Sequence, residues 1–330
     1  MDRVNAKRAE LVSQISEPSN QTRLPQRSSS ALLETDEKSR IKLSDKISIE
    51  DILDRVTDLP PLSDAALKVM QLTSQESATT REISQAIVRD PNFAARVLKL
   101  SNSAYYGLPR AVSTITDSVS LLGNRTIRSM AIVASTQDAL GNEVAGYDLD
   151  SGDLWRHSLA CAMSAQMIAE YIHYPDTEEA FIAGLLHDVG KVILGTYIKE
   201  AMEPIRKYLD EANCTFLEAE NAVLGFDHAE IGGRVAKHWN LPIELYQAIA
   251  WHHEPFQNGG INTLAAIVHA ANAVCLAAGI GLGSDGLRTN INSSVLERFN
   301  LNENVLENVL ERLVTRVSES QPLFELQALT

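Results

Sequence analysis

The sequence is poor in aromatic residues and in cysteine, and each shortage excludes a class of protein. Aromatics make up 5% of the 330 residues while apolar residues make up 45%, much of it Ala and Leu. Sandwiches and barrels use more Val, Tyr, Phe and Trp, so the composition favours an all-α protein. The three cysteines, Cys161, Cys214 and Cys275, form no C-x-x-C pair. The cysteine pattern therefore argues against a disulfide framework and a Cys-rich zinc site, and a reducing cytoplasm fits best.

The chain also has a shortage of positive charge. It carries 29 Lys and Arg against 43 Asp and Glu, a net charge of −14. This balance argues against general binding to a nucleic-acid backbone, although Arg125 and Arg128 form a small basic spot. The first residues lead into no apolar segment of the signal-peptide type. The most apolar stretch, 264–283, contains His269 and Asn272 and predicts a buried helix, so we expect no membrane association.

Composition and periodicity divide the chain into a tail and two helical lobes. Residues 1–45 are polar and predict a disordered tail. From residue 46 onward apolar residues recur at helical spacing, with a capping box predicted at Thr79–Glu82 and a helix start at Asp90-Pro91. Helices are expected over 116–122, 125–140, 177–189 and 199–211, among others, with no strand of useful length. A Gly- and Asp-containing connector, 141–152, places the lobe boundary between 46–145 and 146–330.

The histidines are confined to the second lobe. None of the eight precedes residue 157. Helical phase points five of them and one aspartate toward a common interior, namely His157, His187, Asp188, His228, His252 and His253. Each alone is most simply a hydrogen-bonded core residue, but every buried polar atom without a partner costs ~1–3 kcal/mol. His173 and His238 do not share this phase and are predicted to lie at the surface.

A metal ion would satisfy many imidazoles and a carboxylate at once. Imidazole and carboxylate ligands suit iron, manganese, zinc or nickel. An aspartate beside a histidine can bridge two ions, which is the paired-metal arrangement used in phosphoester hydrolysis. The sequence therefore predicts a site for one or two divalent transition-metal ions.

The segment 187–191, His-Asp-Val-Gly-Lys, resembles the paired His-Asp motif of the HD superfamily of metal-dependent phosphohydrolases. A wider ordered set resembles the HDOD family, the HD-related output domain of bacterial signalling proteins, over about 49–278. The resemblance implies an all-helical HDOD unit over 46–285, whose second lobe is an HD-like bundle, and a regulatory role. The segments that carry it are Leu59-Pro60-Pro61-Leu62, Arg89-Asp90-Pro91, 100–107, 120–123, 155–158, 184–191, 226–230, 239–242 and 252–254.

The resemblance also assigns site residues. Its metal-ligand positions fall on His157, His187, Asp188, His228, His252 and His253, and a seventh, usually a late aspartate, falls on His269. The related phosphodiesterases of cyclic di-GMP carry a Gly-Tyr-Pro loop after the paired histidines. Here Glu254-Pro255-Phe256 follows instead, which argues against efficient hydrolysis of cyclic di-GMP.

Three functions remain open on the sequence. The first is a signalling module that acts through contacts with a protein partner, with or without a bound metal. The second is an active metal-dependent phosphohydrolase, in which Asp188 and Lys191 would be catalytic and Lys191 would hold a phosphate oxygen. Lys191 could equally be a solvated lysine at a helix end. The third, a nucleic-acid-binding output protein, is the least favoured because of the negative charge. Tyr105 and Tyr106, in the separate segment 101–107, are expected to pack the two lobes together, and the alternative for this segment is a contact with a partner or ligand.

Overall fold

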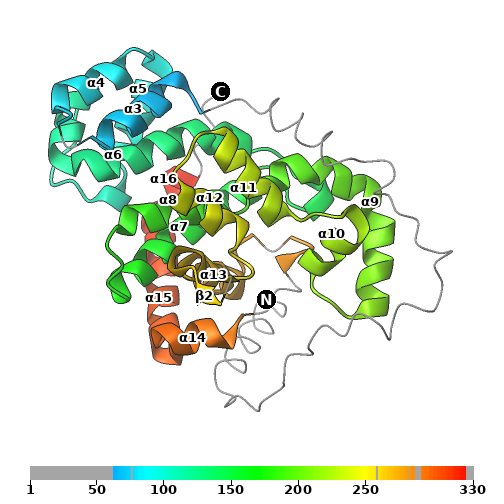
Figure 1. The fold of residues 1–330 in the computed structure, drawn as a ribbon. Coiled ribbons are helices and arrows are strands. Elements are labelled where there is room, and N and C mark those ends of the chain that lie inside the picture. The colour runs from blue at the N-terminus through cyan, green and yellow to red at the C-terminus, as the bar shows by residue number, and fades with distance from the viewer. Residues whose placement is uncertain (1–61, 76, 258, 282, 287–290, 325–330) are drawn as a thin grey trace.

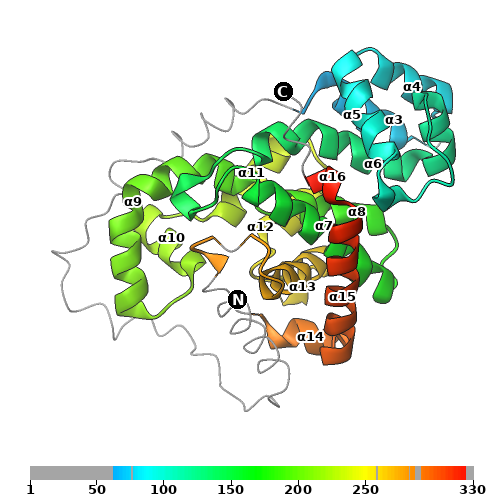
Figure 2. The ribbon, with the colours of Figure 1, turned by 180° about the vertical axis from the view of Figure 1, so that it is seen from behind.

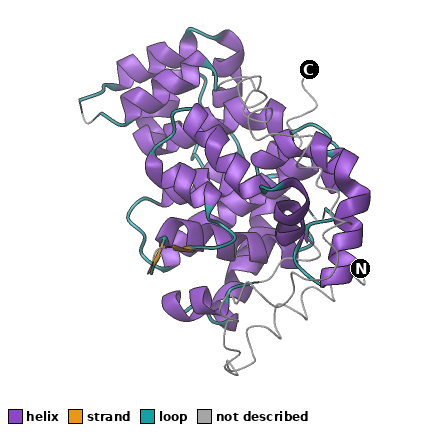
Figure 3. Ribbon diagram, turned by 45° about the vertical axis from the view of Figure 1, so that its right-hand side comes forward, coloured by secondary structure: helices purple, strands orange, loops and turns teal. Residues whose placement is uncertain are grey.

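A computed structural model describes residues 62–324 except 76, 258, 282 and 287–290. The described chain is all-α, as predicted (Figures 1 and 3). The predicted tail and the start of the first lobe lie outside the described residues. In chain order the elements are α3 (Asp64–Thr73), α4 (Thr80–Val88), α5 (Pro91–Ser101), η2 (Ala104–Tyr106), α6 (Ile115–Leu140), η3 (Ala145–Tyr147), α7 (Asp153–Tyr171), α8 (Thr177–Leu186), α9 (Gly190–Ala212), α10 (Phe216–Leu224), α11 (His228–His238), α12 (Ile243–Ala250), β1 (Phe256–Gln257), β2 (Gly260–Ile261), α13 (Thr263–Ala277), α14 (Ser293–Phe299), α15 (Glu303–Glu319) and α16 (Gln321–Phe324).

Helices α3 to α6 pack together at one end of the molecule, where Figure 1 draws them in blue to green. Their starts are the predicted ones. Thr79 and Glu82 form a capping box, and Asp90 caps α5 with Pro91 in its first turn. The two helices expected over 116–122 and 125–140 are both present within α6, which breaks between them at Gly123, where φ is 79° and ψ is 167°. Glycine tolerates these angles, so the break needs no loop.

The second lobe is built around α7, which is buried along most of its length and packs against α8 and α13. Helix α9 contacts α10 and α11 on one side of the molecule, and α15 packs against α7 on the opposite side (Figure 2). The helix predicted over 177–189 ends earlier, at Leu186, and the one predicted over 199–211 begins earlier, at Gly190. Between them lies the turn that carries His187 and Asp188. A pair of two-residue strands, β1 and β2, follows α12.

The lobes meet through side chains from α6 and η2 on one side and from α7 and α8 on the other. Arg128 pairs with Asp176 at 3.0 Å, and the Ser129 hydroxyl donates to Glu178. Tyr105 packs against Phe181 with ring centroids 5.9 Å apart, and its hydroxyl donates to Gln166. Tyr105 therefore packs between the lobes, as expected from the sequence.

One helical stretch of the described chain, 177–212, is long and apolar enough to cross a membrane. It comprises α8 and α9, and 89% of its apolar window is buried inside the fold. Such burial is typical of core helices, and these two carry the turn with His187 and Asp188 between them.

Candidate metal centre

Four separate segments bring the predicted side chains together. His157 comes from the first half of α7, and His187 and Asp188 from the α8–α9 turn. His228 is the first residue of α11, which Asp227 caps, and His252 and His253 follow the end of α12. The α9 and α11 helices approach closely at Gly190, where an added Cβ would lie 2.0 Å from the carbonyl oxygen of His228. Only glycine permits that approach, and it holds His228 beside Asp188.

Asp188 lies at the centre of the group. Its Oδ2 is 3.3 Å from Nε2 of His187 and 3.5 Å from Nε2 of His157. Its Oδ1 is 3.5 Å from Nε2 of His228 and 3.9 Å from Nε2 of His252. His253 joins through a 2.9 Å contact between its Nε2 and that of His228. Six predicted side chains are thus brought into one cluster.

The outer ring nitrogens are held by the fold. Nδ1 of His187 donates to the Gly184 carbonyl oxygen at 2.8 Å, and Nδ1 of His252 donates to that of Ile249 at 2.7 Å. Nδ1 of His157 donates to the carbonyl oxygen of Ile280 at 3.0 Å. With Nδ1 protonated in each ring, the Nε2 lone pairs face the interior, which is how metal-binding histidines are oriented.

Several inward-facing atoms are buried without a hydrogen-bond partner: Nε2 of His187, Nε2 of His252 and Oδ1 of Asp188. Two acceptor nitrogens and a carboxylate oxygen cannot satisfy one another. The cluster contains two groups whose ligand atoms lie within 4.8 Å of one another, His157 with His187 and Asp188, and His228 with His252 and His253. The donor set and these atoms without partners fit a transition metal.

The sequence reasoning missed Glu220, which is fully buried in α10. Its carboxylate accepts from Nδ1 of His228 at 2.8 Å and from the hydroxyl of Tyr147 at 2.5 Å. It fixes the His228 ring in the same way that carbonyl oxygens fix the others. The sequence contained one signal of this role. Glu220 lies on the apolar face of the helix over 216–224, next to Ala219 and four residues before Leu224.

The structure places Lys191 in the interior, where it is 5% exposed, so the solvated-lysine interpretation is wrong. Its Nζ lies 2.6 Å from Oδ2 of Asp188 and 2.6 Å from Oδ2 of Asp285. Asp285 was also missed, because it lies in the irregular segment after α13, where periodicity gives no signal. His173 and His238 are exposed, as predicted.

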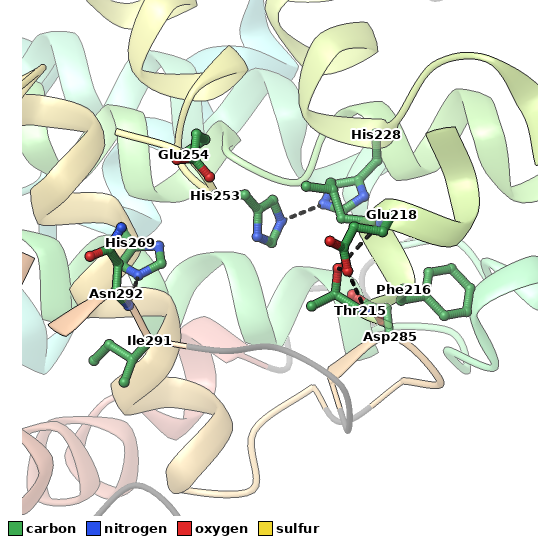
Figure 4. Close-up of a pocket in the computed structure, with 11 residues that line it drawn as sticks. Thr215, Phe216, Glu218, His228, His253, Glu254, His269, Asp285, Ile291 and Asn292 are labelled. Atoms are coloured by element: carbon green, nitrogen blue, oxygen red, sulfur yellow. Dashed lines mark hydrogen bonds between the residues drawn. The ribbon is translucent and has the colours of Figure 1, made fainter. Parts of the chain in front are cut away.

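His269 is not brought into the cluster. Its Nδ1 donates to the carbonyl oxygen of His252 at 2.8 Å, and its Nε2 accepts from the backbone N–H of Asn292 at 2.9 Å. Figure 4 shows its ring beside Asn292 and away from His228. Both ring nitrogens are used, so His269 supports the turn that carries His252 and His253.

Burial and neighbouring charges give the cluster residues different protonation states. Burial lowers the pKa of His187 to about 4, and burial with the neighbouring rings lowers those of His252 and His253 well below the ordinary value. Burial alone would lower the pKa of His228 too, but the Glu220 carboxylate outweighs it and raises it to about 9. For Asp188, nearby His187 and Lys191 outweigh burial and hold the pKa well below its usual range. At neutral pH the cluster therefore offers an anionic carboxylate at Asp188 and neutral imidazoles at His187, His252 and His253, while the Glu220 carboxylate keeps His228 protonated.

A cavity of about 290 Å³ opens beside the cluster. His228, His253 and His269 line it, as do three acidic residues, Glu218, Glu254 and Asp285 (Figure 4). No lysine or arginine is among its described lining residues. The approach to the cluster is therefore negatively charged, which favours cations over anions.

The sequence is similar to a known family of protein domains. The sequence profile of the HDOD domain matches residues 59–255. The chain belongs to the HDOD family. An uncharacterized protein of Treponema pallidum (strain Nichols) is 25% identical over 203 residues, which are 61% of this chain. The HDOD chain spans 39% of that curated relative's length.

Solved structures agree with this HDOD assignment. An HDOD domain protein of unknown function from Geobacter sulfurreducens aligns with a TM-score of 0.65 and 24% identity, covering 86% of this chain and 100% of that one. A Shewanella amazonensis SB2B protein, provisionally named a phosphohydrolase, aligns with a TM-score of 0.63 and 26% identity, covering 83% and 97%. A Marinobacter aquaeolei VT8 protein, provisionally named for signal transduction, has a TM-score of 0.65 and 22% identity, covering 98% of this chain and 66% of that one.

Proposed function

We propose that this chain is a bacterial signal-transduction module that holds a divalent transition metal in its His–Asp cluster and acts through contacts with a signalling protein partner. The observation that supports the metal is the set of buried ring nitrogens and the Asp188 oxygen that face one another without hydrogen-bond partners. The named relative from Marinobacter and the HDOD match support the signalling role. The charge and cysteine content favour a cytoplasmic protein that does not bind nucleic acid.

The cluster offers places for one or two ions. His157, His187 and Asp188 would hold one, and His228, His252 and His253 would hold another. Iron, manganese, zinc and nickel suit these ligands. A metal bound there would supply a Lewis acid and an acidified water. The outer bonds of the rings, including that from His228 to Glu220, would keep the Nε2 atoms directed at the ion.

The surroundings of the cluster favour contact over catalysis. A phosphoester is an anion, but the cavity beside the cluster is lined by carboxylates. Lys191, the one nearby cation that the sequence suggested for a phosphate, is held between Asp188 and Asp285. Among the residues that the structure describes, an anionic substrate would meet carboxylates at the entrance and no lysine or arginine that is not already paired.

The second candidate is a metal-dependent phosphohydrolase. It is favoured by the 26% identity to the Shewanella protein of that provisional name and by the six retained ligand positions. In that case Asp188 would be the central ligand and catalytic residue, while Lys191 would first have to leave its two carboxylates.

One assay separates the two candidates. Full-length protein loaded with manganese or iron is tested on cyclic di-GMP, linear dinucleotides and a simple phosphomonoester. The proposal expects no turnover above that of the His187→Ala and Asp188→Ala variants, although the parent binds metal and the variants do not. Turnover that both substitutions abolish would overturn the signalling-module assignment and establish the phosphohydrolase.

A further inference from the structure

A buried ammonium contacts the central carboxylate of the candidate metal site. Lys191 lies one helical turn after Asp188, at the start of α9, and is 5% exposed. Its Nζ is 2.6 Å from Oδ2 of Asp188, the same oxygen that faces His157 and His187 at 3.5 and 3.3 Å. A metal held by that group would therefore bind an oxygen that the lysine already uses.

A second carboxylate completes the environment of the ammonium. Asp285 lies 94 residues further along the chain and places its Oδ2 2.6 Å from Nζ of Lys191. The segment that carries Asp285 is fixed against the cluster. The Ile280 carbonyl oxygen accepts from His157, Ser284 N–H donates to the Tyr147 carbonyl oxygen, and a Cβ at Gly281 would lie 2.4 Å from that of His157.

We infer that the Lys191 ammonium, held between Asp188 and Asp285, competes with a divalent metal ion for the Asp188 carboxylate. This inference rests on the proposed metal binding. When metal occupies the cluster, the ammonium keeps its bond to Asp285 and gives up Oδ2 of Asp188. Lys191 and Asp285 are thus affinity-setting residues, although neither is a predicted ligand of the ion in this account.

The electrostatics support an exchange over joint occupancy. An ammonium and a divalent ion on one carboxylate oxygen would repel each other at short range in a buried site, where charges are poorly screened. With no metal, Lys191 neutralises the Asp188 charge, so the lobe has a buried ion pair and no lone buried carboxylate there. The exchange also explains how Lys191 is buried in a cluster made otherwise of metal-binding side chains.

The test measures Mn²⁺ affinity on the full chain by titration calorimetry. Lys191→Met keeps the length of the side chain and removes its charge, and is expected to lower the Kd for Mn²⁺ by about tenfold or more, because the competing cation is gone. Lys199→Met is the matched control, an exposed lysine on the same helix, and should leave the Kd unchanged. Asp285→Asn should raise the Kd by about tenfold, because the displaced ammonium loses its second carboxylate.

The outcomes separate this inference from the proposed function. A parent that binds Mn²⁺ and a Lys191→Met variant that binds it no more tightly would overturn the exchange and leave the metal site intact. If neither protein binds Mn²⁺, both proposals fail. If Lys191→Met folds only when Mn²⁺ is present, as followed by circular dichroism, the competition is supported. If it does not fold in either condition, the Asp285→Asn result decides, and an unchanged Kd there contradicts the inference.

Discussion

At the scale of single residues, Asp188 is the central predicted ligand of the metal site. Its two oxygens face ring nitrogens of His157, His187, His228 and His252 at 3.3 to 3.9 Å, so each ring depends on one carboxylate. The buried carboxylate remains ionised because His187 and Lys191 lie beside it. A charged ligand of this kind distinguishes a metal site from a hydrogen-bonded core of histidines.

Asp188→Asn is expected to raise the Kd for Mn²⁺ or Fe²⁺ by about a hundredfold or more, because it removes the only negative charge among the predicted ligands. His269→Asn should change the Kd by less than about tenfold, since its ring nitrogens bond to the backbone of His252 and Asn292. Exposed His238→Asn is the control. Equal losses in the His269 and Asp188 variants would contradict the assignment of ligands.

The sequence predicted the ligand cluster but not the residues that hold it. The helical positions of the histidines within 157–253 were enough to predict that six side chains point to one interior, because each lies on or beside a helix with a clear apolar face. Glu220 and Asp285 were missed because their roles arise from contacts across 8 and 94 residues, which no local pattern encodes. The position of His269 was also not predictable, since its partners are backbone groups 17 and 23 residues away.

At the scale of elements, the approach of α9 to α11 fixes the site. Gly190→Ala would place a Cβ 2.0 Å from the His228 carbonyl oxygen and 2.6 Å from the Gly232 nitrogen. Both neighbours are backbone atoms, so the helices must separate. We expect a loss of about 3 kcal/mol or more in the free energy of unfolding, measured by urea denaturation.

The control for Gly190→Ala is Gly260→Ala, where the nearest atom lies 3.8 Å from the added Cβ. It should change the free energy of unfolding by no more than about 0.5 kcal/mol. A Gly190→Ala protein as stable as this control would show that α9 and α11 do not approach as described.

The interface between the lobes contains a largely buried carboxylate, Glu178, whose ionised form is destabilised by the loss of contact with water. Burial raises the pKa of Glu178 above its ordinary value, although Ser129 and Gln166 donate hydrogen bonds to it. A carboxyl group with a raised pKa in the folded state binds its proton more tightly there, so it costs stability once pH rises above the unfolded value of 4.5. The α6–α8 contact is thus weakened as the pH rises.

Glu178→Gln should therefore increase the melting temperature at pH 8 relative to the parent by more than it does at pH 4.5. The amide carries no charge and keeps an acceptor for the Ser129 hydroxyl. Exposed Glu307→Gln on α15 is the matched control. A parent and variant that respond to pH in parallel would show that the Glu178 carboxylate is not destabilised by burial.

At the scale of the whole molecule, metal binding should be visible as stability of the fold. A metal that binds only the folded state adds RT ln(1 + [L]/Kd), ~2.7 kcal/mol at a hundredfold excess over Kd. EDTA should therefore lower the melting temperature of the full chain by a few degrees, and should lower that of Asp188→Ala by much less. Equal effects of EDTA on both proteins would indicate that the stabilising ion lies elsewhere.

Long-range architecture was predicted from the sequence better than exact helix ends. The all-α fold is confirmed, because caps and apolar spacing are local signals. Tyr105 contacts Phe181 of α8 and Gln166 of α7, which agrees with the packing expected of it. The end of α8 at Leu186 and the start of α9 at Gly190 were not predicted. Between these two ends, a turn over 187–189 directs His187 and Asp188 into the cluster, although the apolar sequence around it is typical of a continuous helix.

The most direct test of the central claim is the metal content of the full chain purified without an affinity tag. Elemental analysis is done on the protein as isolated and after anaerobic reconstitution with iron or manganese, followed by removal of free ion. The account predicts one to two transition-metal ions per chain in the parent and background levels in His187→Ala and Asp188→Ala. A parent protein that holds no metal above background after reconstitution would contradict it.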